Sequence, residues 1–329
     1  LKHENLSRQE AAELLSALLD STATDAQIAG ALVSLASKGA TVDELTGMAG
    51  AMRERAVRVE SKHNCFIDTA GTGSSPAKTF NIGTAAAFVI AGAGLPVAKH
   101  GSRAATSRSG SADVLTALGV NVSVAPEVTA NCLDSIGICF MFAPLYHGAT
   151  ARVAAIRREL GLHTVFNLLG PLTNPARAPR QIIGVFDPSL TEPMAETLQA
   201  LGTEKAWVVH GADGLDEVTV AGATTVSEAS LDGVNTFQIG PRDFGLELES
   251  LDHLRGGDAA ANAAIIMQVL TGARRDAARN IVIINAAAAL FVGGIAEDLL
   301  DAARLAIESI DSGQALKKLD QLIEATKAK

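Results

Sequence analysis

Aromatic residues and long apolar runs are both scarce in this chain of 329 residues. Aromatic residues make up 4% of the sequence and hydrophobic residues 48%, so the core must be built from Ala, Val, Ile and Leu. An aliphatic core of this kind is typical of helices packed on a buried sheet. No apolar run approaches the roughly 20 residues that a membrane-spanning helix needs, which argues against an integral membrane protein.

Positive charge is also in short supply. The chain carries 27 Lys and Arg against 36 Asp and Glu, which gives a net charge of −9 at neutral pH. A nucleic-acid-binding protein generally presents a basic face, so this class of function is disfavoured. A negative net charge is nevertheless compatible with a local cationic pocket for one small phosphorylated ligand.

Cysteine is rare as well, and its pattern indicates the compartment. Cys65, Cys132 and Cys139 are scattered without C-x-x-C spacing, which is typical of reduced, small core residues in a cytosolic protein. Residues 1–5 show no charged segment followed by an apolar one, so we recognise no signal peptide. We therefore expect a cytoplasmic protein.

The first part of the chain predicts consecutive helices with short loops between them. Ser7 and Glu10 have the spacing of a capping box, and so do Thr41 and Glu44. A further helix is expected to begin near Thr24. We interpret residues 1–64 as a small helical domain. The family resemblance described below leads us to expect that a later helical segment near 165–178 completes it.

Strands and helices alternate from Cys65 onward. The expected strands cover residues 65–68, 96–98, 138–142, 182–186 and 206–209. The expected helices between them cover residues 85–93, 111–118, 151–160 and 193–201, and residues 258–327 are predicted to be helical again. This alternation predicts an α/β fold with a central, mostly parallel sheet covered on both faces, over residues 65–329.

Two loops carry the signals for phosphate binding. Residues 71–75, Gly-Thr-Gly-Ser-Ser, follow a strand and come shortly before a helix, where glycines let the backbone approach an anion closely. Alone, this motif is more often a plain tight turn. Residues 99–111 gather Lys99, Arg103 and Arg108 with four serines at the end of the next strand. That composition favours a ligand with several anionic oxygens over a solvated flexible loop.

These loops and the motifs after them, read together, resemble anthranilate phosphoribosyltransferase. The matching segments run in order along the chain at residues 71–82, 97–101, 109–113, 164–175, 210–217, 255–258 and 285–287. The resemblance implies a fold of the nucleoside phosphorylase/phosphoribosyltransferase type, a substrate site at the domain junction and a homodimer. It also implies transfer of the phosphoribosyl group from phosphoribosyl pyrophosphate (PRPP) to anthranilate in tryptophan biosynthesis, with Mg²⁺ as the cofactor.

The resemblance assigns roles residue by residue. The implied PRPP-binding residues are Gly71, Ser74, Ser75, Thr79, Asn81, Ile82, Gly83, Thr84, Lys99, His100, Gly101, Ser102, Arg103, Ala104, Ala105, Thr106, Ser107 and Ser111. The implied anthranilate-binding residues are Gly71, Ser102 and Arg157, and the implied metal ligands are Asp216 and Glu217. No dedicated catalytic side chain is implied, because Lys99 and Mg²⁺ would stabilise the developing charge.

Several positions depart from the usual family pattern. Ser74 and Ser75 stand in place of Gly-Asp, Gly83 in place of a serine ligand of the metal, Ser102 in place of an asparagine and Gly148 in place of a proline. Two alternatives therefore stay open: a phosphoribosyltransferase of the same family with another aromatic acceptor, and a non-catalytic ligand-binding paralogue. A pyrimidine nucleoside phosphorylase shares the implied fold, but its lysine- and serine-bearing loop is not found here.

Overall fold

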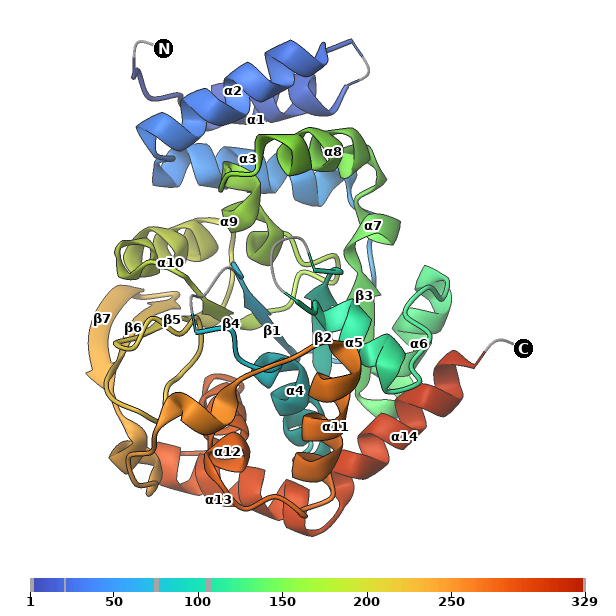
Figure 1. Ribbon diagram of the computed structural model, residues 1–329. Helices are drawn as coiled ribbons and strands as arrows, with labels where there is room; N and C mark the ends of the chain where they lie inside the picture. Colours follow the sequence, from blue (N-terminus) through green and yellow to red (C-terminus); the bar gives the residue numbers. More distant parts are fainter. Residues whose placement is uncertain (1–2, 21, 74–76, 105–107, 328–329) are drawn as a thin grey trace.

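A computed structural model of the chain describes residues 3–20, 22–73, 77–104 and 108–327. Its N-terminal part consists of α1 (Arg8–Leu19), α2 (Asp25–Lys38) and α3 (Val42–Arg55) (Figure 1). Each helix begins at a capping box. The N-cap Ser or Thr side chain accepts a hydrogen bond from a backbone N–H of the first turn, and the Glu or Gln side chain three residues later accepts one from the backbone N–H of the N-cap residue. The helical start predicted from the sequence is therefore confirmed.

Segments from later in the chain return to these helices. The connection from the sheet runs through α7 (Ala143–Tyr146) and the 3-10 turn Gly148–Thr150 to α8 (Ala151–Leu160) and α9 (Val165–Leu172). The α8 helix packs against α2 and α1, and Figure 1 shows α9 between the helices and the sheet. Apolar side chains of the two parts share one buried cluster, which includes Leu15, Ile28 and Met48 together with Phe166 and Leu169.

The remaining chain is organised around one sheet in which the strands lie in the order β3-β2-β1-β4-β5-β6-β7. The neighbouring pairs among the first five strands are all parallel. These strands are β1 (Ile67–Gly71), β2 (Val97–Gly101), β3 (Ile138–Phe142), β4 (Arg180–Gly184) and β5 (Lys205–Gly211). The mostly parallel α/β fold expected from the sequence is thus confirmed, although β1 begins two residues later than the predicted strand.

One edge of the sheet was not predicted. An antiparallel hairpin of β6 (Thr224–Ser230) and β7 (Gly233–Ile239) extends the sheet beyond β5. Its strands are partly exposed and rich in Thr, Ser and Asn, so they lack the continuous apolar run that marks the buried parallel strands. The hairpin is an example of an antiparallel edge on a parallel sheet.

Helices cover both faces of the sheet. The α10 helix (Thr191–Ala200) packs on β5 and β6 and on α3, whereas α4 (Ile82–Gly92) packs against α12 (Ala277–Val292) on the other side (Figure 1). The remaining helices are α5 (Ser111–Ala117), α6 (Pro126–Ile136), α11 (Ala259–Leu270), α13 (Leu299–Asp311) and α14 (Gln314–Thr326), with 3-10 turns at Pro188–Leu190, Pro241–Phe244 and Leu251–Leu254. Among the described residues, no helix combines the length and apolar character needed to cross a bilayer.

Glycine ends several of the parallel strands. Gly71, Gly101, Gly184 and Gly211 are the last residues of β1, β2, β4 and β5. A Cβ atom added to Gly184 would lie 1.6 Å from the carbonyl oxygen of Asp216. The absence of a side chain therefore lets the loop after β5 fold across the end of β4.

We predict that Gly184→Ala lowers the free energy of unfolding by at least about 2 kcal/mol, because the new methyl group overlaps rigid backbone. The matched control is Gly30→Ala in α2, where nothing lies within 4 Å of the added Cβ. That change should raise stability by about 0.5–1 kcal/mol, since alanine favours helix more than glycine. Urea unfolding of both variants measures the difference, and a Gly184→Ala protein as stable as the parent would contradict the packing described.

Candidate active site

The candidate site lies where the order of the strands reverses. From β1 the chain continues outward to β2 and β3, whereas β4 and β5 are added on the opposite side of β1. In open α/β sheets, ligands bind at such a switch point beyond the carboxyl ends of the strands. The backbone N–H of Thr72 donates to the carbonyl of Gly184 at 2.8 Å, and the hydroxyl of Thr72 accepts from the N–H of Phe186 at 3.1 Å. These bonds fix the loop after β1 against the loop after β4.

Lys99 is a buried cation in the middle of β2. Its side chain is 7% exposed, and its Nζ donates to the carbonyl oxygen of Thr69 and, at 3.3 Å, to the Thr69 hydroxyl. Burial lowers the pKa of Lys99, while the negative charges of Asp68 and Glu217 act in the opposite direction. The ammonium group is therefore held between two carboxylates in a poorly solvated place.

Asp68 is the buried carboxylate on β1 beside Lys99. It accepts the backbone N–H of His100 at 3.1 Å and the side-chain amide of Asn174 at 2.7 Å. Burial raises its pKa to about 6, and Lys99 and these hydrogen bonds oppose the shift. Asp68 thus connects β1, β2 and the segment after α9 at one point.

Asp216 and Glu217 follow β5 and face the start of α4. The Oε1 atom of Glu217 accepts the backbone N–H of Gly83 at 3.1 Å. Burial and then the charge of Asp216 raise the pKa of Glu217 to about 8, and burial likewise raises the pKa of Asp216. Adjacent carboxylates that resist ionising together are stabilised by a divalent cation.

These carboxylates fit a magnesium ion that shares its ligands with a substrate. Mg²⁺ in proteins is commonly held by one or two carboxylates together with phosphate oxygens and water. Within the described ranges of the chain, no group of three or more His, Cys, Asp or Glu side chains could hold a metal alone. A Cβ added to Gly83 would lie 3.2 Å from Oε1 of Glu217 and 3.9 Å from Nζ of Lys99, so a serine at this position would reach the same place.

The basic loop after β2 is closed by Asp113 of α5. The carboxylate of Asp113 accepts backbone N–H groups of Ala104 at 2.9 Å and Gly110 at 3.0 Å, and it pairs with Nη1 of Arg103 at 2.9 Å. The guanidinium of Arg103 also lies 5.6 Å from the centre of the Phe142 ring. The two ends of the loop are thereby held together, and Arg103 is engaged within the protein.

The structure brings many of the expected PRPP-binding residues to this edge of the sheet. Gly71, Lys99, His100 and Gly101 are at the ends of β1 and β2, while Ile82, Gly83 and Thr84 begin α4 and Ser111 begins α5. Thr79 forms a bridge to Arg255, and the side chain of Asn81 bonds the carbonyl of Ser109 and the amide of Asn262. Ser74, Ser75, Ala105, Thr106 and Ser107 lie outside the described residues.

Arg157 lies on α8 at the helical side of the junction. Its Nη2 donates to Oδ1 of Asn167 at 3.1 Å, and its guanidinium is 5.5 Å from the centre of the Phe166 ring. Its Nε is buried without a hydrogen-bond partner. A buried donor without an acceptor is uncommon and suits a site that an anionic ligand completes.

Arg157 is connected to the sheet edge through α9 rather than by direct contact. In the described part of the chain it forms no hydrogen bond or ion pair with Lys99 or Glu217. The backbone of Gly170, near the end of α9, lies close to the ring of His100, and that of Thr173 lies close to the ring of His147. The rings of His100 and His147 lie 5.1 Å apart between centroids.

Sequence reasoning missed several residues that organise this site. Asp68, Asn174, Asp113 and Asn262 were not among the expected site residues, yet each fixes a loop or strand end. A signal was available for Asp68, because it is an acidic residue at the end of an apolar strand segment. Asn174 and Asn262 gave no such signal, since their partners are distant in the sequence.

The fold and the comparisons together define a glycosyl transferase with a helical bundle beside an α/β part. Residues 63–316 match the family model described as "Glycosyl transferase family, a/b domain", and residues 1–56 match "Glycosyl transferase family, helical bundle domain". A relative from Moorella thermoacetica named "Anthranilate phosphoribosyltransferase" is 50% identical over 97% of this chain and 94% of its own length. The chain belongs to the anthranilate phosphoribosyltransferase family.

Solved structures agree with this family. Anthranilate phosphoribosyltransferase from Thermus thermophilus superposes with a TM-score of 0.93 at 38% identity, covering 99% of this chain and 97% of that one. The enzyme of the same name from Saccharomyces cerevisiae, solved in complex with PRPP and Mg, gives a TM-score of 0.89 at 28% identity, covering 98% and 93%.

We predict that the buried His147 makes the fold sensitive to acid. Burial lowers the pKa of His147 to about 4, whereas an unfolded histidine titrates near 6.5. Below pH 6.5 the unfolded chain binds the proton more readily, so the free energy of unfolding should fall between pH 6.5 and about 4, by at most about 3 kcal/mol. His147→Gln should flatten this part of the profile in urea unfolding, and His253→Gln, at an exposed position, should not. Equal slopes in all three proteins would contradict the prediction.

Proposed function

We propose that this chain transfers the phosphoribosyl group of PRPP to the amine of anthranilate, giving N-(5-phosphoribosyl)anthranilate and pyrophosphate in tryptophan biosynthesis. The observation that carries the proposal is the cluster at the switch point, where the buried Lys99 and Glu217 both lie near Gly83 and Asp216 adjoins Glu217. We place the substrate crevice there, beyond the ends of the parallel strands. The name of the Moorella relative and the PRPP and Mg in the yeast complex support both substrate and cofactor.

The chain would act mainly by positioning and by stabilising charge. The amine nitrogen forms a bond to C1 of the ribose while the bond from C1 to the pyrophosphate oxygen breaks, and pyrophosphate leaves with the electron pair. The nitrogen then loses one proton, which pyrophosphate or water accepts. This transition state resembles an oxocarbenium ion, so it requires orientation and complementary charge rather than a nucleophilic side chain. We assign Lys99 and the backbone of the loop after β2 to the leaving pyrophosphate.

The donor site would include backbone as well as side chains. Gly71 after β1, the start of α4 at Ile82, Gly83 and Thr84, and Ser111 at the start of α5 offer N–H and hydroxyl groups near one another. Thr79 forms a β-bridge to Arg255, and Asn81 accepts a hydrogen bond from the side chain of Asn262. These contacts fix the chain just before α4. We assign Ser74, Ser75 and residues 102–107 to the same site on the family resemblance.

Asp216 and Glu217 would hold Mg²⁺. When bound, the ion neutralises the charge that develops on pyrophosphate. Because Gly83 brings a backbone N–H but no hydroxyl to Glu217, the protein would supply these carboxylates alone as side-chain ligands.

Arg157 would select the acceptor. A guanidinium binds a planar carboxylate with paired hydrogen bonds, and the Nε of Arg157 has no hydrogen-bond partner among the described residues. We assign Gly71 and Ser102 to the anthranilate ring on the same side of the crevice.

We also propose that the chain works in the cytoplasm as a homodimer that associates through its helical bundle. Its free thiols at Cys65, Cys132 and Cys139 support a reducing compartment. The exposed apolar side chains Val33 of α2 and Leu162 after α8, each 41% exposed, support an association surface there. Light scattering of the purified chain measures its mass in solution.

Activity with the proposed substrates is the first test. With Mg²⁺, PRPP and anthranilate, the fluorescence of anthranilate should fall with time, and a chelator should stop the reaction. Glu217→Gln should lower the rate at limiting Mg²⁺ more than at saturating Mg²⁺. Turnover only with another aromatic acceptor would overturn the substrate assignment, and loss of pyrophosphate release with every acceptor would indicate a ligand-binding paralogue.

A second prediction separates the roles of acceptor and donor residues. Arg157→Ala should raise the KM for anthranilate at least tenfold and change the KM for PRPP far less, because only the acceptor loses a charged contact. The matched control is Arg158→Ala, the neighbouring exposed arginine on α8, which should leave both constants within about twofold. Equal increases in both KM values for Arg157→Ala would contradict the assignment.

A further inference from the structure

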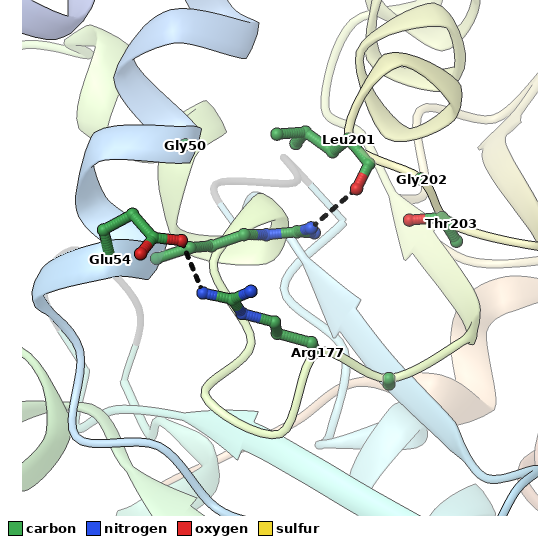
Figure 2. Close-up of a pocket in the computed structure, with 8 residues that line it drawn as sticks. Gly50, Glu54, Arg177, Leu201, Gly202 and Thr203 are labelled. Atoms are coloured by element: carbon green, nitrogen blue, oxygen red, sulfur yellow. Dashed lines mark hydrogen bonds and ion pairs between the residues drawn. The ribbon is translucent and has the colours of Figure 1, made fainter.

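A second hollow lies at the junction of the two parts of the molecule, formed by different residues from those of the crevice described above. It has a volume of about 260 Å³ and is lined by the last turn of α3, the segment after α9 and the turn between α10 and β5. The lining residues are Gly50, Arg53, Glu54, Arg177, Ala178, Leu201, Gly202 and Thr203. Figure 2 shows Glu54 and Arg177 on one side of it and Leu201, Gly202 and Thr203 on another.

Arg53 reaches into this hollow from the helical part. Its Nε donates to the carbonyl of Leu172 at 2.7 Å and its Nη1 to the carbonyl of Leu201 at 3.4 Å. These carbonyls lie at the ends of α9 and α10, where the helix dipoles favour a cation. These two hydrogen bonds stabilise part of the positive charge of Arg53, but its Nη2 atom has no hydrogen bond to any described residue.

The hollow carries more positive than negative charge. Among the described residues, Arg53 forms no ion pair with a carboxylate, and Arg177 pairs only with Glu54, whose side chain is 74% exposed. Burial and the nearby charge of Arg177 lower the pKa of Arg53 to about 10. An exposed ion pair contributes little, so Arg177 can leave Glu54 at small cost and turn toward another anion.

The wall opposite the arginines offers a further donor. Thr203 has no side-chain hydrogen bond within the described ranges, although it is only 4% exposed. The turn at the end of α10 fixes its position. There the backbone N–H groups of Gly202 and Thr203 donate hydrogen bonds to the carbonyls of Gln199 and Leu198, respectively. Arg53, Arg177 and Thr203 therefore surround the hollow with hydrogen-bond donors from three separate segments.

We propose that this hollow is a second anion-binding site, which takes a small oxyanion such as phosphate or a carboxylate between Arg53, Arg177 and Thr203. Guanidinium groups bind both kinds of oxyanion through charge-assisted hydrogen bonds. Because Arg53 belongs to α3 whereas Thr203 precedes β5, a bound anion ties the helical part to the sheet. The site thus links anion concentration to the relative position of the two parts that enclose the crevice.

Calorimetric titration of the whole chain with inorganic phosphate at constant ionic strength tests the proposal. The parent should show binding at two sites, one in the crevice and one in the hollow. Arg177→Gln should weaken one of them at least tenfold, and Thr203→Val should weaken the same site roughly fivefold. Binding at the crevice serves as an internal reference in every variant.

The matched control is Arg55→Gln, which also removes one positive charge, but from an exposed position at the end of α3, the helix that carries Arg53. It should keep both sites within about twofold of the parent. A parallel titration with acetate distinguishes a site for carboxylates from one restricted to phosphate, and binding of either anion that depends on Arg177 supports the proposal. Absence of any phosphate or acetate binding that depends on Arg177, an unchanged titration for Arg177→Gln, or an equal loss for Arg55→Gln would overturn it. Arg53 is left intact because its capping of two helices makes its loss a folding defect.

Discussion

The burial of the Lys99 ammonium between Asp68 and Glu217 is the interaction on which the rest of the site depends. A buried charge is tolerated only when opposite charge and hydrogen-bonding groups surround it, and the removal of one partner leaves the others uncompensated. Here the carbonyl and hydroxyl of Thr69 accept hydrogen bonds from the Lys99 ammonium, while Asp68 of β1 and Glu217 after β5 lie near enough for negative charge on them to favour it. The strands β1, β2 and β5 must therefore hold their relative positions for the cation to remain ionised where a pyrophosphate can meet it.

The shape of the crevice follows from small residues at the ends of strands. Gly184 lets the backbone of Asp216 cross the end of β4, and Gly83 lets the carboxylate of Glu217 approach the first turn of α4. A larger residue at Gly184 would overlap the backbone of Asp216 and displace the segment that carries both carboxylates. The same edge is connected to the helical part by α9, whose backbone meets His100 and His147 while Asn167 holds Arg157. The α9 helix therefore connects the buried charges at the edge of the sheet to the arginine proposed to bind the acceptor.

Much of the fold could be predicted because its signals are local. The capping boxes at Ser7 and Thr41 and the apolar run of β3 depend on residues close together in the sequence. The hairpin of β6 and β7 was not predicted, because its partly exposed strands resemble polar loops in composition. The loops at the site were recognisable from glycine, serine and cation content, whereas Asn174 and Asp113 gained importance only through the partners that folding gave them.

The sequence by itself determined the alternating architecture, the two phosphate-type loops and the family, since these rest on periodicity, composition and ordered motifs. Only the tertiary structure decided which charges meet. The closeness of Lys99 to Glu217, the hydrogen bonds of Asp113 to its loop and the hollow around Arg53 each join segments that are separated in the sequence, so the sequence does not show their distance in space. The physical reason is that burial sets the strength of an electrostatic contact, and burial is a property of the packed molecule.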